Sequence, residues 1–218
     1  MTQEAIDKLD TIAEIKPHPP SKMQVFTCSM ISLFALIIIS FPSISATPRL
    51  RLEDTTNSNY TDFIKASCGT TRYADLCFKT LSPFATAVGN SEMELANVAL
   101  SVSLKSAKST SKAVRELLKG RDVSMQDGMA VADCLESMSD SVDEMRKSMV
   151  EMKGLDGPDF EEKMGNVKTW VSAALTDEDT CMDGFEENAG KMKETIRGYI
   201  LNVAQLTSNA LALITNIS

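Results

Sequence analysis

The chain has 218 residues and a formal net charge of −8, and its single histidine is His18. An acidic chain of this kind is poorly suited to nucleic acid or another polyanion as its main partner. His18 lies in a predicted leader, so the mature chain has no imidazole, which excludes Ser-His-Asp and Cys-His catalytic systems and histidine-ligated zinc. We therefore expect no enzymatic activity, no metal centre, no cofactor and no small-molecule substrate.

The N-terminal part of the chain has the features of a secretory leader. An apolar stretch of ten residues, Met30–Ile39, has the length of a signal-peptide core and is short for a membrane span. We predict a signal peptide over 23–46, with cleavage after Ala46 or one residue earlier and no membrane attachment afterwards. Residues 1–22 are balanced in charge and are interpreted as an unusual extension upstream of a start at Met23. The alternative is an uncleaved signal anchor.

The predicted mature chain, 47–218, has the composition of a secreted domain. Three basic and four acidic residues leave with the leader, so 19 Lys+Arg and 26 Asp+Glu remain and the net charge is −7. An asparagine, Asn59, starts an Asn-Tyr-Thr sequon in a polar stretch, which predicts N-glycosylation. Four cysteines remain, an even number that favours disulfides in an oxidising compartment: Cys68, Cys77, Cys134 and Cys181.

The mature chain has the hydrophobic periodicity of helices. Apolar residues recur at steps of three and four rather than two, so we predict an all-α fold. A polar, flexible segment is expected over 47–59. Two short helices are expected over 60–85, with Cys68 and Cys77 near their junction, and a local disulfide there would make a helical hairpin.

Four long helices are predicted within 90–218, and short links join them, which is typical of an antiparallel four-helix bundle. Their approximate limits are 91–118, 124–153, 158–187 and 190–215. The expected core face of the first helix comprises Leu95, Val98, Val102, Ser106, Ser109, Ala113 and Leu117. The expected faces of the other helices include Met125 in the second, Phe160 and Met182 in the third, and Tyr199 in the fourth.

Antiparallel packing of the helices predicts which cysteines lie close together. An early residue of the second long helix, Cys134, would lie beside a late residue of the third, Cys181. A bridge between them would leave Cys68 to pair with Cys77, which is one of the three pairings that four cysteines allow. Closing a loop of about 47 residues stabilises a fold by roughly 3–4 kcal/mol in the chain-entropy model.

Two charged rows are predicted on the outer faces of the bundle. The first long helix carries a basic row, namely Lys105, Lys108, Lys112, Arg115 and Lys119. The second carries an acidic row, namely Glu136, Asp140 and Asp143. Both rows fit solvated helix faces that add little stability. The functional interpretation is a bipolar docking surface for another protein, in which charge chiefly sets orientation and association rate.

A stretch in the third long helix carries a family signature. Residues 169–185 read TWVSAALTDEDTCMDGF, and 132–143 read ADCLESMSDSVD, with the third cysteine of the mature chain. Residues 68–77 place eight residues between two cysteines. Together these segments resemble the plant invertase and pectin methylesterase inhibitor family, and the resemblance spans 60–218.

The resemblance implies a bridged helical hairpin, a four-helix bundle, and the disulfides Cys68–Cys77 and Cys134–Cys181. It also implies a non-catalytic inhibitor in the apoplast, the space of the plant cell wall. Such an inhibitor forms a non-covalent complex with pectin methylesterase and covers the pectin-binding cleft. Carried onto this sequence, the resemblance implies six enzyme-contacting residues: Lys108, Ser111, Lys112, Glu136, Asp140 and Asp143.

The family divides between two targets, pectin methylesterase and the acid invertases of wall or vacuole. Members that block invertase often carry a Pro-Lys-Phe tripeptide. This chain has Gly157, Pro158, Asp159 and Phe160 instead, with an acid where the basic residue would be. The absence of the tripeptide favours pectin methylesterase, and acid invertase is the alternative.

Two other classes share parts of the pattern. A structural or signalling four-helix protein would have the same fold and inhibit no hydrolase, and a receptor-like partner would identify it. A hydrolase or metal enzyme is disfavoured because so many such sites depend on imidazole.

Overall fold

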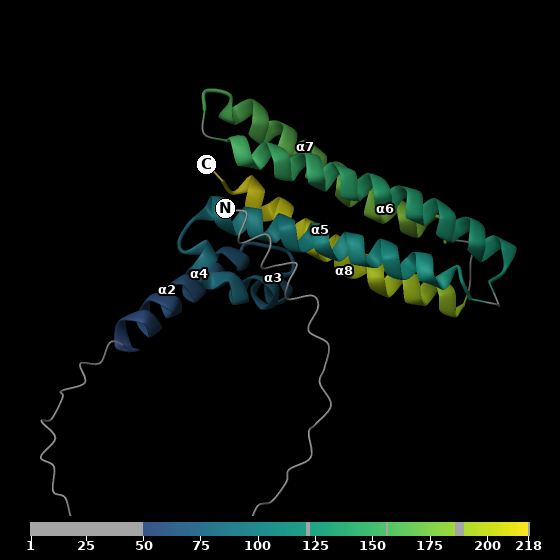
Figure 1. Ribbon diagram of the computed structural model, residues 1–218, viewed down its shortest axis with the longest axis horizontal. Coiled ribbons are helices and arrows are strands. Elements are labelled where there is room, and N and C mark those ends of the chain that lie inside the picture. Colours follow the sequence, from purple (N-terminus) through teal and green to yellow (C-terminus); the bar gives the residue numbers. More distant parts are fainter. Residues whose placement is uncertain (1–49, 121–122, 156, 186–189, 218) are drawn as a thin grey trace, which may run out of the picture. The chain divides into compact units, whose positions relative to one another are not determined.

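The protein is built of helices joined by short turns in its described part in the computed structural model (Figure 1), which covers residues 50–120, 123–155, 157–185 and 190–217. The predicted extension and leader lie outside the described residues, and residues 54–218 form one compact unit. The elements are α2 (Leu50–Cys68), α3 (Ala74–Leu81), η2 (Ser82–Phe84), α4 (Ala85–Val88), α5 (Glu92–Leu117), α6 (Met125–Glu151), η3 (Met152–Gly154), α7 (Phe160–Asp183) and α8 (Lys191–Thr215). No strand occurs among these residues. The predicted all-α class, a four-helix bundle after a bridged helical hairpin, is confirmed.

The four long helices pack side by side in a ring. α5 lies against α6 and α8, and α7 lies against the same two helices. Figure 1 shows the α6–α7 pair along one side of the bundle and the α5–α8 pair along the other. Short links make consecutive helices antiparallel. The side-chain amide of Asn202 in α8 donates to Ser106 Oγ in α5 at 3.3 Å, so these residues mark the level at which the two helices meet.

Local signals set the ends of the long helices. Ser91 and Ser124 are the N-caps of α5 and α6, and their hydroxyls accept from the backbone N–H groups three residues later. Gly190, which precedes α8, has a φ of 131°, a conformation that side-chain-bearing residues rarely adopt. The third predicted helix was too long at both ends, because α7 begins at Phe160 and its C-cap is Gly184.

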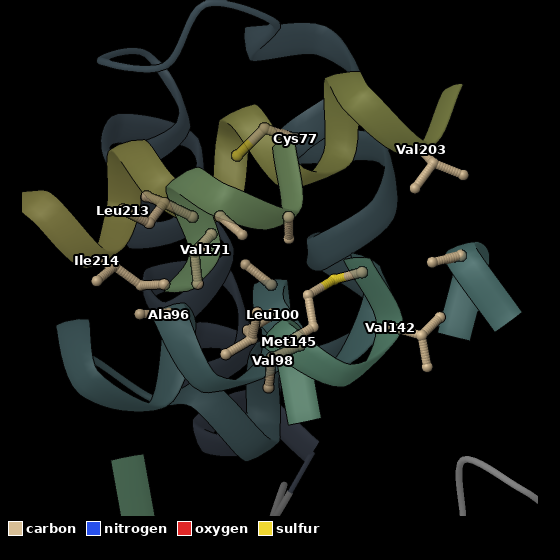
Figure 2. Packing of buried hydrophobic residues seen from close by; sticks show 14 of the residues in the cluster. Cys77, Ala96, Val98, Leu100, Val142, Met145, Val171, Val203, Leu213 and Ile214 are labelled. Atoms are coloured by element: carbon tan, nitrogen blue, oxygen red, sulfur yellow. The ribbon is translucent and has the colours of Figure 1, made fainter. Parts of the chain in front are cut away.

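Core positions of the bundle recur every 3.5 residues rather than every 3.6. In α7 and just beyond it the buried residues are Met164, Val167, Val171, Ala174, Glu178, Cys181 and Phe185. In α8 they include Ile196, Ile200, Val203, Thr207, Ala210 and Ile214. Steps of three and four that alternate strictly are the heptad spacing of helices wound in a left-handed bundle. Figure 2 shows several of the apolar core side chains packed together.

Three of the core residues predicted from the sequence are exposed instead, and one of them, Ser109, is exposed because of this repeat. The row expected on α5 advanced by about 3.7 residues per step, so it drifted off the core. Ser109 is exposed and Ala113 half-buried, while Thr110 and Val114 are buried instead. The other two are Met125, which is 85% exposed at the start of α6, and Tyr199, which is 42% exposed beside the buried Ile200.

A helical hairpin packs against one end of the bundle. The disulfide Cys68–Cys77 ties α2 to α3, and α3 lies against α5 and α8. A buried side-chain amide, Asn209 in α8, holds the turn: Asn209 Nδ2 donates to the Tyr73 carbonyl at 3.0 Å, and the Tyr73 N–H donates to Asn209 Oδ1 at 3.1 Å. The amide thereby supplies one partner for each backbone group of that residue.

The segment expected to be flexible, 47–59, is described from Leu50 onward, and its flexibility stays a prediction. The chain is helical from Leu50, because this segment continues the same helix, α2, whose C-terminal half is anchored. Ile64 is fully buried, and Tyr60 and Phe63 pack against the core. Residues 56–59, which lie in the same helix, are exposed, in keeping with their polar composition.

Candidate functional site

The four cysteines of the predicted mature chain form two bridges. The structure joins Cys68 to Cys77 and Cys134 to Cys181, the pairing that the family resemblance implies. All four are 1% exposed. The second bridge connects α6 to α7, which together carry 13 of the 17 acidic residues of the four long helices. These disulfides hold the scaffold and are shielded from reagents in solvent.

The three acidic residues expected to contact an enzyme lie on the outer side of α6. Glu136, Asp140 and Asp143 are all exposed. Asp143 accepts from Arg146 Nη1 at 2.6 Å, within the same helix. An exposed pair of this kind adds little stability, so the three carboxylates are available to a partner.

The acidic row continues onto the neighbouring helix α7. Burial raises the pKa of Asp177 above its ordinary value, and the charges of Asp140 and Glu144 raise it further. α7 packs against α6, so like charges on the two helices act on one another across the α6–α7 seam. We call Glu136, Asp140, Asp143, Glu144 and Asp177 the acidic face. Glu144 and Asp177 were not predicted, because spacing along one helix does not show which helix lies beside it.

Cationic side chains pair with only part of the acidic face. Lys147 Nζ donates to Glu144 Oε1 at 2.9 Å, and this bond together with nearby carboxylates raises the pKa of Lys147. Among the described residues, no ion pair engages Glu136, Asp140 or Asp177. The face thus presents negative charge that the rest of the described chain does not neutralise.

The three residues expected to contact an enzyme from α5 differ in accessibility. Lys108 and Lys112 are exposed. Ser111 is half-buried, and its hydroxyl is enclosed with no hydrogen-bond partner among the described residues. The two lysines can therefore meet a partner directly, whereas the Ser111 hydroxyl is shielded from one. The α5 and α6 residues lie on neighbouring helices.

A polar cluster lies in the centre of the bundle, with one residue from each long helix. Thr207 Oγ1 and Ser141 Oγ each donate to Glu178 Oε1 at 2.9 Å, and Ser103 Oγ lies 2.6 Å from Thr207 Oγ1. All four residues are fully buried. Burial raises the pKa of Glu178 to about 8, against the lowering effect of the two hydroxyl donors. The carboxyl is therefore protonated at acidic pH.

This central cluster was not predicted from the sequence, although a signal exists. Glu178 and Thr207 both fall on the alternating three–four spacing of their helices, where apolar residues are the norm. Because Glu178 has no access to solvent, it has no route to a substrate. The cluster therefore affects the stability of the fold. A partner can meet only the charged surfaces of the molecule.

Two other kinds of site are absent from the described residues. No group of histidine, cysteine or carboxylate side chains there is arranged to hold a metal ion. No helix in the same residues is long and apolar enough to cross a membrane. The predicted glycosylation residue, Asn59, is exposed on α2, and its modification stays a prediction.

Comparison with known proteins gives the family. The family model described as plant invertase/pectin methylesterase inhibitor matches residues 62–213. The chain belongs to this family. The match runs from α2 to α8 and includes both disulfides and the acidic face. The family is one of inhibitor proteins rather than enzymes, in agreement with the expectation from the missing imidazole.

Several relatives of this family member are named pectinesterase inhibitors. Pectinesterase inhibitor 9 of Arabidopsis thaliana is 43% identical over 194 residues, which cover 84% of this chain and 92% of that protein. Pectinesterase inhibitor 10 of the same plant is 44% identical over 164 residues, which cover 73% of this chain and about half (53%) of that protein. A crystal structure of a mutant form of an Arabidopsis pectin methylesterase inhibitor matches with a TM-score of 0.59 at 18% identity. The match covers 71% of this chain and 97% of that one, and it shows the shared fold.

Proposed function

We propose that the protein is a secreted inhibitor of plant pectin methylesterase, which binds the enzyme non-covalently and occludes its pectin-binding cleft. The observation that carries the proposal is the set of relatives named as pectinesterase inhibitors, one of which is matched over 92% of its length. The acidic face supports it, because uncompensated exposed charge orients a protein toward a complementary, basic partner. Secretion to the apoplast follows from the predicted signal peptide over 23–46.

The mechanism requires no reaction of the inhibitor. A rigid helical bundle laid across the cleft keeps the polymer out, so inhibition is competitive with pectin. The described residues supply exposed charge for orientation and a stapled scaffold for rigidity, and preorganised surfaces lose little entropy on binding. We assign the main contacts to the acidic face, and Lys108 and Lys112 to its border on α5. Ser111 would join them only if the complex opened its enclosed hydroxyl.

Acid invertase is the second candidate target. The family model includes invertase inhibitors. The turn before α7, where Pro158 and Asp159 lie, is exposed. The turn has the acidic Asp159 where a basic residue would be, and Asp159 forms an ion pair with Lys163 of α7 at 2.8 Å. This arrangement favours pectin methylesterase over invertase as the target.

Reversal of charge on the acidic face tests the assigned contacts. We expect the variant Glu136→Lys/Asp140→Lys/Asp143→Lys to inhibit pectin methylesterase at least about tenfold less well, because attraction at the interface becomes repulsion. The measurement is the inhibition constant at mildly acidic pH, together with co-elution of inhibitor and enzyme in size-exclusion chromatography. The melting temperature of the variant reports whether the bundle remains folded.

A matched control carries the same charge change elsewhere. Asp62, Asp75 and Asp179 are exposed and lie outside the acidic face, and their replacement by lysine should leave inhibition within about threefold of the natural chain. Equal inhibition by the folded acidic-face variant and the natural chain would remove the acidic face from the interface.

A further inference from the structure

Charge is divided between the two sides of the bundle. The α6–α7 pair carries 13 acidic and 4 basic residues, whereas the α5–α8 pair carries 7 basic and 4 acidic residues. The formal charges are thus −9 on one side and +3 on the other. Soluble domains ordinarily intersperse the two signs. The α5–α8 side of the bundle is therefore positive although the chain as a whole is negative.

The electrostatics of individual groups agree with this division. On the acidic side, the charges of Asp140 and Glu144 contribute to the raised pKa of Asp177. On the basic side, a hydrogen bond from Lys119 Nζ to Glu116 at 2.7 Å lowers the pKa of Glu116, and nearby lysine and arginine charges lower it further. The direction of each pKa shift therefore follows the sign of the charges that surround the group.

The positive side contains a straight row of cations. Lys105, Lys108, Lys112, Arg115 and Lys119 are all exposed and follow one face of α5 and its C-terminal end. Fourteen residues of helix extend about 21 Å. The row does border α6, but α7 lies diagonally across the bundle from α5, farther away than the Debye length of about 8 Å at physiological ionic strength. Salt therefore screens the row from the acidic residues of α7, and an anion that approaches α5 from outside meets local positive charge.

We propose that this basic row binds a linear polycarboxylate, de-esterified homogalacturonan, which is the polymer that pectin methylesterase produces. The choice of polymer rests on the proposed function, whereas the preference for a linear polyanion rests on the row itself. A polymer with one carboxylate on every sugar can lie along a single helix face and meet several cations in turn. Lysine, which supplies four of the five cations, acts as a point charge on a flexible stem and tolerates variable spacing.

This binding would differ from inhibition in its ligand and its consequence. A fully methyl-esterified polymer carries no charge, so it would not bind. The free inhibitor would gather where the esterase has already acted, because only there does the wall expose carboxylates. The expectation from net charge, that a polyanion is a poor partner, applies to the molecule as a whole and not to this side of it.

The test measures retention of the full secreted chain on immobilised polygalacturonate, with the fully methyl-esterified polymer as the neutral matrix. We expect retention on polygalacturonate alone, with a strong dependence on salt. The variant Lys105→Gln/Arg115→Gln/Lys119→Gln should bind about tenfold more weakly at low salt, because three charge contacts are lost. Its substitutions avoid the lysines assigned to the enzyme interface.

The matched control is Lys79→Gln/Lys153→Gln/Lys168→Gln, which makes the same change in net charge away from α5 and should retain full binding. Absence of retention of the natural chain, or equal weakening of both variants, would overturn the proposal. Equal binding to vesicles of anionic phospholipid would also overturn it and assign the row to a membrane surface. No esterase is present in this assay, so a chain that binds polymer but fails to inhibit contradicts the proposed function alone.

Discussion

Replacement of Glu178 by glutamine is expected to abolish most of the stability that the folded protein loses with rising pH, a loss of about 3 kcal/mol at pH 7. The folded-state pKa of Glu178 is about 8, above the ordinary value of 4.5, because the carboxyl is buried. Folding therefore favours the protonated form. The stability is fully present below about pH 4.5 and is lost progressively as pH rises toward 8.

The central cluster explains why glutamine should be tolerated. The amide oxygen of the introduced glutamine would accept from Ser141 and Thr207, as Glu178 Oε1 does now. The amide stays neutral at every pH, so no charge is forced into the core. The neighbours Asp177 and Asp179 on the same helix also disfavour a charged Glu178, and they remain in the variant.

The measurement is the free energy of unfolding in urea at several pH values between 4.5 and 8. The natural chain should lose stability across this range, whereas Glu178→Gln should follow a nearly flat curve. An exposed control, Glu136→Gln, should retain the pH dependence of the natural chain. A natural chain whose stability did not fall over this range would show that Glu178 ionises without cost and would contradict the assignment.

Loss of the bridge between α6 and α7 has the second large expected effect. The variant Cys134→Ala/Cys181→Ala should lose about 3–4 kcal/mol of unfolding free energy, because the bridge joins cysteines 47 residues apart. For a domain of this size that corresponds to a fall in melting temperature of about 10 °C. Calorimetry at pH 5, where Glu178 is protonated in both folded proteins, measures the difference.

The hairpin bridge gives a natural comparison. The cysteines of Cys68–Cys77 are only nine residues apart, so the variant Cys68→Ala/Cys77→Ala should lose less, about 2.5 kcal/mol in the same chain-entropy model. A melting temperature that does not change when Cys134 and Cys181 are replaced would contradict a stabilising role for that bridge.

Features that depend on neighbouring residues in the chain were predictable from the sequence. Ser91 and Ser124 cap α5 and α6 at the predicted starts of these helices, and the four long helices lie close to their predicted limits. Features that depend on packing between helices were not predictable. The change from a 3.6- to a 3.5-residue repeat moved the core of α5 from Ser109 to Thr110, which no single-helix pattern requires.

The candidate site was predictable in part for the same reason. The row of Glu136, Asp140 and Asp143 could be recognised from spacing, since all three residues lie on one helix. The contribution of Asp177 became visible only when α7 was seen beside α6. The central Glu178 looked like one more residue of an acidic stretch, because its burial depends on packing against other helices.

The central claim is that this member of the family inhibits pectin methylesterase. The most direct measurement is parallel inhibition of a plant pectin methylesterase and a cell-wall invertase by disulfide-intact residues 47–218 at mildly acidic pH. The account predicts loss of esterase activity with invertase unaffected. Inhibition of invertase alone would contradict it and move the interface toward the turn at Pro158, and inhibition of neither enzyme would contradict the proposed function altogether.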